Sequence, residues 1–274
     1  MGDLQIKTFE EHRQFLVDMI RLKLWFVHRW LARHPEEDLS FVLRWRVDIY
    51  RKSVFWRGRG FPTGADFGLS GWSALEQKIQ KLHDESCSET DSSIFESEAF
   101  EVVWKVVEPN AFHDYQASIA SKGFQCDSLG YDPPRAEKPR LVWFHITNAL
   151  QPSSILDDKT YLPKCFSCLM DEAETEFNAD SLGTGTWMNS YPRWLDLFPE
   201  EYLENMGPKE EAVWCSLGFW GQFVNARGTL HKERAKTFRE TESLPYSWRY
   251  SWCSFEAMRA HLRTYLAGLI ESVA

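Results

Sequence analysis

The sequence lacks a long uncharged apolar segment, and its cysteines are sparse. The most apolar stretches, 22–31 and 141–146, are too short or too charged to cross a bilayer, which takes about 20 apolar residues. The segment 1–15 has no basic region followed by an apolar run and no small-residue cleavage site, so we expect no secretory signal. Without one, sparse cysteines indicate reduced thiols in a cytoplasmic protein. The cysteines are Cys87, Cys126, Cys165, Cys168, Cys215 and Cys253.

The signatures of several enzyme classes are also missing. There is no Walker A loop, HExxH, GxSxG elbow or EF-hand loop, and the glycines at 58, 60 and 64 miss the dinucleotide fingerprint by one residue. These absences argue against nucleotide hydrolysis, zinc proteolysis and α/β-hydrolase chemistry. Basic residues are outnumbered, 31 against 40 acidic, for a net charge of −9. An acidic chain repels phosphate backbones, so we expect neither a nucleic acid nor a membrane as partner.

Tryptophan, by contrast, is abundant. The 274 residues include 13 tryptophans, and aromatic side chains make up 15%. Hydrophobic content of 43% and charged content of 26% indicate a folded globular chain. A surplus of tryptophan indicates an aromatic core, an aromatic-lined pocket, or a surface that stacks on sugars or peptides. The core is the favoured interpretation.

Helical periodicity fills the first half of the chain. Thr8 and Glu11 form a capping box before a helix expected over 9–33. Further helices are expected after Asp38, after a second capping box at Ser73, over 94–107 and over 111–120. The glycine-rich segment from Gly58 to Gly71 cannot continue a helix and is expected to be a loop, plausible as a lid.

Strands alternate with helices in the second half. Strands are expected over 140–147, 181–188, 212–224 and 246–252, and helices over 160–177, 190–206, 229–241 and after Ser254. Proline and glycine in 126–139 mark the boundary between regions 1–137 and 138–274. The fold class is therefore α/β, with a mixed α+β fold as the alternative. A helical N-terminal region would pack on a C-terminal layered sheet, and the two regions would form one integrated globular unit.

An asparagine follows each of the first three expected strands. Asn148, Asn189 and Asn225 would lie where ligands bind in layered α/β proteins, outside the carboxyl ends of strands. Three amides there would offer donors and acceptors to a polar substrate. The alternative is structural, because asparagine is a preferred helix N-cap and helices are expected after these points.

His145, two residues from the end of its strand, is the candidate general base or acid, since its pKa lies near working pH. The alternative is a core histidine with satisfied hydrogen bonds. Asp157 and Asp114 are candidates to orient its ring. Arg227 could clamp a carboxylate, or pair with a surface acid. Trp143 and Trp187 would wall the pocket.

Two further patterns are weighed against structural alternatives. Cys165 and Cys168 form a CxxC motif, but they lie inside an amphipathic helix, and we interpret them as core cysteines rather than a zinc or redox site. Residues 1–60 carry 12 basic and 8 acidic side chains. The arginines and lysine of 44–59 could bind an anion, but we expect them to pair with the acidic segment 84–101.

The sequence thus supports three functional hypotheses. The first is a cofactor-independent enzyme of the lyase, isomerase or cyclase type that performs acid–base chemistry on an aromatic or apolar small molecule. The second is a metal-dependent oxygenase or hydrolase that holds a divalent metal with His113, His145 and Asp157. The third is a non-catalytic binding protein lined by aromatic side chains.

Overall fold

The computed structural model describes residues 7–56, 66–86, 92–120 and 123–271, and it divides the chain into two compact units. The helical unit comprises 1–120, 213–216 and 223–244. The sheet unit comprises 121–212, 217–222 and 245–274. The expected combination of an N-terminal helical region with C-terminal strand–helix elements is confirmed. Among the described residues, no helix is long and apolar enough to cross a membrane.

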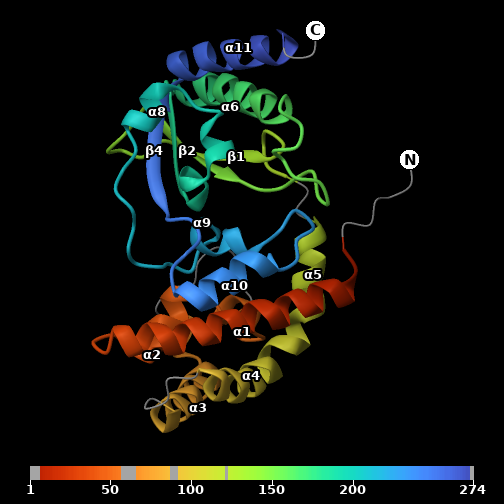
Figure 1. The fold of residues 1–274 in the computed structure, drawn as a ribbon, viewed down its shortest axis with the longest axis vertical. Helices are drawn as coiled ribbons and strands as arrows, with labels where there is room; N and C mark the ends of the chain where they lie inside the picture. Colours follow the sequence, from red (N-terminus) through yellow and green to blue (C-terminus); the bar gives the residue numbers. More distant parts are fainter. Residues whose placement is uncertain (1–6, 57–65, 87–91, 121–122, 272–274) are drawn as a thin grey trace. The chain divides into compact units, whose positions relative to one another are not determined.

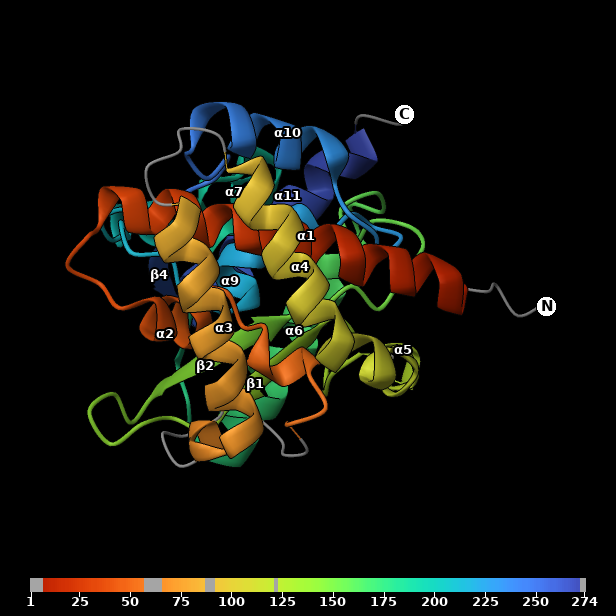
Figure 2. The same ribbon diagram turned by 90° about the horizontal axis from the view of Figure 1, so that it is seen from below.

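The helical unit is built around the long helix α1. Its elements are α1 (Phe9–Arg33), α2 (Leu39–Phe41), a π-helix (Val42–Arg46), a 3-10 helix (Tyr50–Lys52), a 3-10 helix (Asp66–Gly68), α3 (Ser70–Ser86), α4 (Ser93–Val107), a 3-10 helix (Glu108–Asn110), α5 (Ala111–Ala120) and α10 (Lys232–Thr241). The predicted capping box opens α1: the Glu11 amide donates to Thr8 Oγ1 at 3.1 Å, and the Thr8 amide donates to Glu11 Oε2 at 2.8 Å. Helix α4 lies beside α1 and α3 (Figures 1 and 2).

Two expectations for this unit need correction. The third helix begins at Ser70 instead of Ser73, because the carbonyl of Leu69 already accepts hydrogen bonds from the amides of Trp72 and Ser73. Asp38 precedes a single α-turn that widens into the π-helix, and its side chain makes no capping bond. Most of the expected loop between Gly58 and Gly71 lies outside the described residues.

The sheet unit contains a four-stranded mixed sheet in the order β1-β2-β3-β4. Its elements are β1 (Leu129–Asp132), β2 (Leu141–Ile146), α6 (Tyr161–Phe177), β3 (Ser181–Thr186), a 3-10 helix (Trp187–Ser190), α7 (Pro192–Leu195), α8 (Glu200–Glu204), α9 (Leu217–Trp220), a 3-10 helix (Gly221–Phe223, whose last residue belongs to the helical unit), β4 (Arg249–Ser254) and α11 (Phe255–Glu271). Strands β2 and β3 are parallel and joined through α6, and both outer pairings are antiparallel.

One face of the sheet carries the core of this unit. Val142 and Phe144 of β2 pack with Phe166 of α6, and neighbouring strand residues alternate between the two faces. Helices α6 and α11 lie next to each other on this side (Figure 1). Ser254 caps α11 as expected, since its Oγ accepts from the Ala257 amide at 3.2 Å.

Segment 212–224 is not a strand. It forms an irregular stretch, then α9 and a 3-10 helix, so Asn225 does not follow a strand. A Cβ atom on Gly218 would lie 3.0 Å from Nε1 of Trp248, so glycine allows the helix to approach this ring closely. Strand β1 was not expected, because its four residues gain their conformation from pairing with β2.

The expectation of reduced thiols is wrong for Cys126 and Cys168, which form a disulfide with a Cα–Cα distance of 5.8 Å. Cys165 is a buried free thiol, in agreement with its interpretation as a core cysteine. The same interpretation is wrong for Cys168. The loop that contains Cys126 brings this distant thiol to α6, a contact that the spacing of the CxxC motif does not indicate.

Candidate functional site

The three asparagines form hydrogen bonds within the protein. Asn148 closes a turn, donating to the Ser153 carbonyl at 2.9 Å and accepting from the Leu150 amide at 3.0 Å. Asn225 accepts from the Thr229 amide at 3.1 Å within its own loop. Asn148 and Asn189 belong to the sheet unit, whereas Asn225 belongs to the helical unit.

Asn189 is buried at the end of β3 and uses its amide four times. Its Nδ2 donates to the carbonyls of Thr184 and Arg249 at 3.0 and 2.9 Å. Its Oδ1 accepts from Trp194 Nε1 at 3.2 Å and from the Tyr202 hydroxyl at 2.8 Å. The side chain thus ties strands β3 and β4 to α7 and α8.

His145 lies on the sheet face opposite α6, and the structure pairs it with a residue that the sequence did not indicate. Its Nε2 is 2.8 Å from Asp132 Oδ2, and both side chains are more than half exposed. Asp157 instead accepts from the Ser154 amide at 3.2 Å and lies 4.0 Å from Arg193. The expectation that Asp157 or Asp114 orients His145 is therefore wrong.

The remaining predicted site residues are spread over both units. Trp143 packs against Tyr250 with ring centroids 4.9 Å apart, and Trp187 against Tyr246 at 5.6 Å. Arg227 is exposed, and its Nη2 lies 3.6 Å from Glu11. His113 is exposed in the helical unit, whereas His145 and Asp157 belong to the sheet unit.

The basic segment 44–59 pairs locally. Arg44 donates from Nε to Glu76 at 2.6 Å, Arg46 from Nη2 to Glu37 at 2.6 Å, and Arg51 from Nε to Asp48 at 2.7 Å. Within the described part of the chain, the acids that these three arginines are seen to bind lie outside 84–101, at positions 37, 48 and 76. Arg57 and Arg59 lie outside the described residues.

Asp114 is the predicted residue with the most distinctive surroundings. It lies in the first turn of α5 and receives two groups: His12 Nε2 at 2.9 Å from Oδ2, and Lys52 Nζ at 2.7 Å from Oδ1. Lys7 is a close charged neighbour of both Asp114 and Lys52. We call Lys7, His12, Lys52 and Asp114 the α1–α5 cluster.

Local structure fixes each member of the α1–α5 cluster. The capping box at Thr8 sets the first turn of α1, which carries His12, and leaves Lys7 just before the helix. Asn110 donates from Nδ2 to the Lys52 carbonyl at 3.2 Å and so ties this lysine to the start of α5. The Tyr115 hydroxyl donates to the Lys7 carbonyl at 3.0 Å. These hydrogen bonds fix the backbone of Lys7 and Lys52 next to α5.

Burial and charge shift the pKa values in the α1–α5 cluster. Burial alone would raise the pKa of Asp114, but the hydrogen bond from His12 and the ammonium of Lys52 outweigh it and hold this pKa well below its usual range. Desolvation lowers the pKa of Lys7 to about 8, although the charge of Asp114 acts in the opposite direction. Asp114 is therefore ionised at neutral pH.

One nitrogen of the His12 imidazole, Nε2, is hydrogen-bonded, whereas the other, Nδ1, has no hydrogen-bond partner among the described residues. An ionised carboxylate can only accept, so Nε2 of His12 carries the proton that Asp114 binds. In the neutral ring, Nδ1 is then an acceptor. This atom is buried. Buried polar atoms are usually satisfied, so an open Nδ1 beside an Asp–His contact marks a candidate site for proton transfer.

Aromatic rings surround the open imidazole. The rings of Tyr115 and Phe15 lie 5.7 and 6.1 Å from that of His12, and the Lys7 ammonium lies 5.4 Å from the Phe15 centroid. The cluster therefore combines an acid–base group, cationic side chains and apolar surface. Of these four, the sequence indicated Asp114 as a candidate and Lys52 as part of a basic segment. It indicated neither Lys7 nor His12, and His12 occupies a core position of an amphipathic helix.

A second buried lysine lies further along α1. Burial lowers the pKa of Lys23 to about 8, while Asp48 opposes this shift, and Lys52 and Arg51 add to it. Lys52 therefore influences the charge of both buried lysines.

No protein-family model matches the chain, and no curated protein or solved structure is significantly similar to it.

Proposed function

We propose that the protein is an enzyme that transfers a proton on a small molecule with an apolar body and an anionic group, at the α1–α5 cluster. The supporting observation is the buried His12–Asp114 contact with its open Nδ1. An aspartate that fixes the tautomer and stabilises the imidazolium is the usual support of a histidine base. The reaction class is isomerisation or elimination, which needs no cofactor of its own.

Each member of the α1–α5 cluster has a distinct role in this proposal. Nδ1 of His12 removes a proton from carbon or oxygen of the substrate. Asp114 keeps the ring oriented and balances the positive charge that develops on it. The ammonium groups of Lys7 and Lys52 attract the anionic group and stabilise negative charge that develops after proton removal. Phe15 and Tyr115 contact the apolar body.

The experiment is proton exchange in D2O, which needs no knowledge of the product. A panel of small carboxylic acids with acidic C–H bonds is incubated with the protein, and loss of the 1H signal is followed by NMR. We expect exchange that His12→Gln reduces by at least a hundredfold, since general base catalysis contributes 10²–10⁴-fold. The matched control is His113→Gln, at an exposed position beside Asp114. Equal exchange by His12→Gln and the wild type would contradict the proposal.

An aromatic surface in the sheet unit supports a second candidate, non-catalytic binding of a sugar. Trp143 and Tyr250 are half-buried neighbours, and the Lys138 ammonium lies 5.1 Å from the Tyr250 ring and donates to its hydroxyl at 3.2 Å. Aromatic faces stack on sugar rings, and the lysine can bond to their hydroxyls. Trp143→Ala should abolish binding to a panel of glycans. The fluorescence of Trp194, which is buried and unchanged in this variant, reports whether the variant is folded. Unchanged glycan binding would contradict this candidate.

A further inference from the structure

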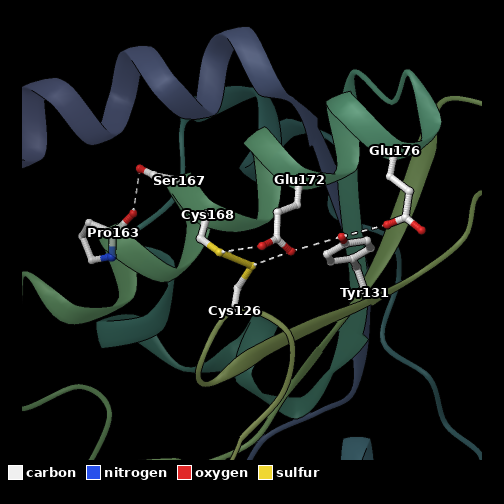
Figure 3. The surroundings of a disulfide bond; sticks show 7 residues. All are labelled: Cys126, Tyr131, Pro163, Ser167, Cys168, Glu172 and Glu176. Atoms are coloured by element: carbon white, nitrogen blue, oxygen red, sulfur yellow. Dashed lines mark hydrogen bonds between the residues drawn. A yellow bond between two sulfur atoms is a disulfide. The ribbon is translucent and has the colours of Figure 1, made fainter.

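The Cys126–Cys168 disulfide has an unusual neighbour. Glu172 lies one turn after Cys168 on α6, and Figure 3 shows its carboxylate facing both sulfur atoms. Oε2 is 3.5 Å from Cys126 Sγ, and Oε1 is 3.6 Å from Cys168 Sγ. A single side chain therefore spans the two sulfurs of the bond.

In the oxidised state, the disulfide offers no hydrogen bond to the Glu172 carboxylate. A disulfide sulfur has no proton to donate, so Glu172 gains no hydrogen bond from either cysteine. The Tyr131 hydroxyl nevertheless holds it in place, with 3.3 Å to Glu172 Oε2 and 3.2 Å to Glu176 Oε2. Burial, with the hydrogen bond to Glu176 next in effect, raises the pKa of Tyr131 to about 12, so the hydroxyl remains a donor.

Reduction would turn the same three residues into a ligand set. Without a cation, two thiolates and a carboxylate would repel one another at this spacing, and a divalent cation that takes the place of the thiol protons removes that repulsion. The three ligand atoms lie within 4.8 Å of one another. We propose that reduction of the Cys126–Cys168 disulfide creates a zinc site, with Cys126, Cys168 and Glu172 as its three protein ligands.

The distances fit this ion. Tetrahedral zinc with a Zn–S bond of about 2.3 Å and a Zn–O bond of about 2.1 Å places sulfur and oxygen ligands about 3.6 Å apart. In the structure, the sulfur–oxygen distances from Cys126 and Cys168 to Glu172 are 3.5 and 3.6 Å. Only the two sulfurs must separate, to about 3.8 Å at the same angle and bond lengths. Soft thiolate ligands select zinc over magnesium or calcium.

The surroundings also match a zinc site. Tyr131 donates to Glu172 and so provides the outer hydrogen bond that orients a ligating carboxylate. Cys126 is buried, whereas Glu172 is exposed and Cys168 half-buried. The solvent side therefore leaves the fourth coordination position to water, as in zinc sites that have three protein ligands.

The chemistry balances with two molecules of a thiol reductant. The first thiolate attacks one sulfur, forms a mixed disulfide with that cysteine and releases the other cysteine as a thiol. The second thiol displaces the first cysteine and leaves as the oxidised disulfide of the reductant. Zinc then replaces one proton on each cysteine, so binding releases two protons.

The test compares zinc uptake by the oxidised and the reduced full-length chain. One sample is reduced with a phosphine and desalted without oxygen, and both are dialysed against buffered zinc and analysed by mass spectrometry for metal. We expect about one more zinc ion per chain in the reduced sample. Cobalt should give the thiolate charge-transfer absorption only after reduction.

Five variants locate the site. Cys126→Ser and Cys168→Ser should lose the additional zinc. Cys165→Ser, a buried free thiol on the same helix, is their control and should keep it. Glu172→Gln retains both cysteines and should weaken zinc affinity at least tenfold, whereas Glu176→Gln, one turn further along, should change it less than threefold.

Two results would overturn the inference. One is equal zinc uptake by the oxidised and reduced wild-type chain. The other is retention of the additional zinc by Cys126→Ser, which would place the metal elsewhere. Glu172→Gln tests the site even if the cysteine variants misfold, since it leaves the disulfide intact. Unchanged affinity in this variant would remove the carboxylate from the ligand set.

Discussion

Two histidine–aspartate contacts of almost equal length occur in this protein, one in each unit. His12 Nε2 lies 2.9 Å from Asp114 in the helical unit, and His145 Nε2 lies 2.8 Å from Asp132 in the sheet unit. The His12 side chain is 2% exposed, whereas that of His145 is 53% exposed. Water and salt screen the exposed contact, but they reach the buried one far less.

The surroundings of such a pair, more than its length, set how strongly its two groups interact. Burial adds a desolvation penalty to each charge, so the buried groups depend on one another. Nδ1 of His12 is buried and has no hydrogen-bond partner among the described residues. The exposed pair keeps its hydration whether or not the contact forms.

The strongest test of the comparison replaces each aspartate. Asp114→Asn removes the carboxylate that two basic side chains share, and it should lower the free energy of unfolding by about 3 kcal/mol. Asp132→Asn should lower it by less than about 1 kcal/mol. Urea unfolding of both variants measures the difference. Similar losses in the two variants would mean that burial does not separate the pairs.

A second test asks whether burial also determines how much a polar side chain stabilises the fold in the sheet unit. Asn189 is a buried polar residue in the sheet unit with four hydrogen bonds, and Asn189→Ala should lower the free energy of unfolding by about 3 kcal/mol. Asn148→Ala, a turn residue of the same unit, should lower it by about 1 kcal/mol. If Asn189→Ala proved as mild as Asn148→Ala, the buried network would not stabilise the sheet unit.

The third test uses pH. Lys7 has a folded-state pKa of about 8 against an ordinary value of 10.5, so protonation is penalised only in the folded state. Lys7→Met should therefore stabilise the protein at pH 7, by roughly 2 kcal/mol. This advantage should shrink as pH rises from 8 to 10.5, because the folded wild type loses the penalised proton of Lys7 first, while the unfolded chain still holds it. A difference that stays constant across this range would contradict the lowered pKa.

Local signals made most of the fold predictable. The capping box at Thr8 and the apolar period located α1, and the same logic located α4, α5 and α6. These elements depend on neighbours three or four residues away. Strand β1 was missed because its conformation depends on pairing with β2. The segment 212–224 was misassigned because its conformation depends on the close approach of Gly218 to Trp248. Such contacts join residues far apart in the sequence.

The candidate site was predictable only in part. Asp114 was singled out, but its partner His12 is 102 positions away, and the apolar rows of α1 conceal that histidine. His145 was identified correctly as lying on a strand, yet its carboxylate partner lies on β1, which was not expected. A single sequence indicates which residues are chemically capable, but it does not indicate which of them meet.

The connectivity of the two units has a consequence for biosynthesis. The helical unit includes α10, which ends at Thr241, and the sheet unit includes β4, which begins at Arg249. Neither unit is complete until the ribosome has made more than 240 of the 274 residues. Neither unit can therefore finish folding before its last segment has been made, and the nascent chain would expose unpaired strand edges until then. We expect expression to respond to chaperone supply more strongly than the size of either unit suggests.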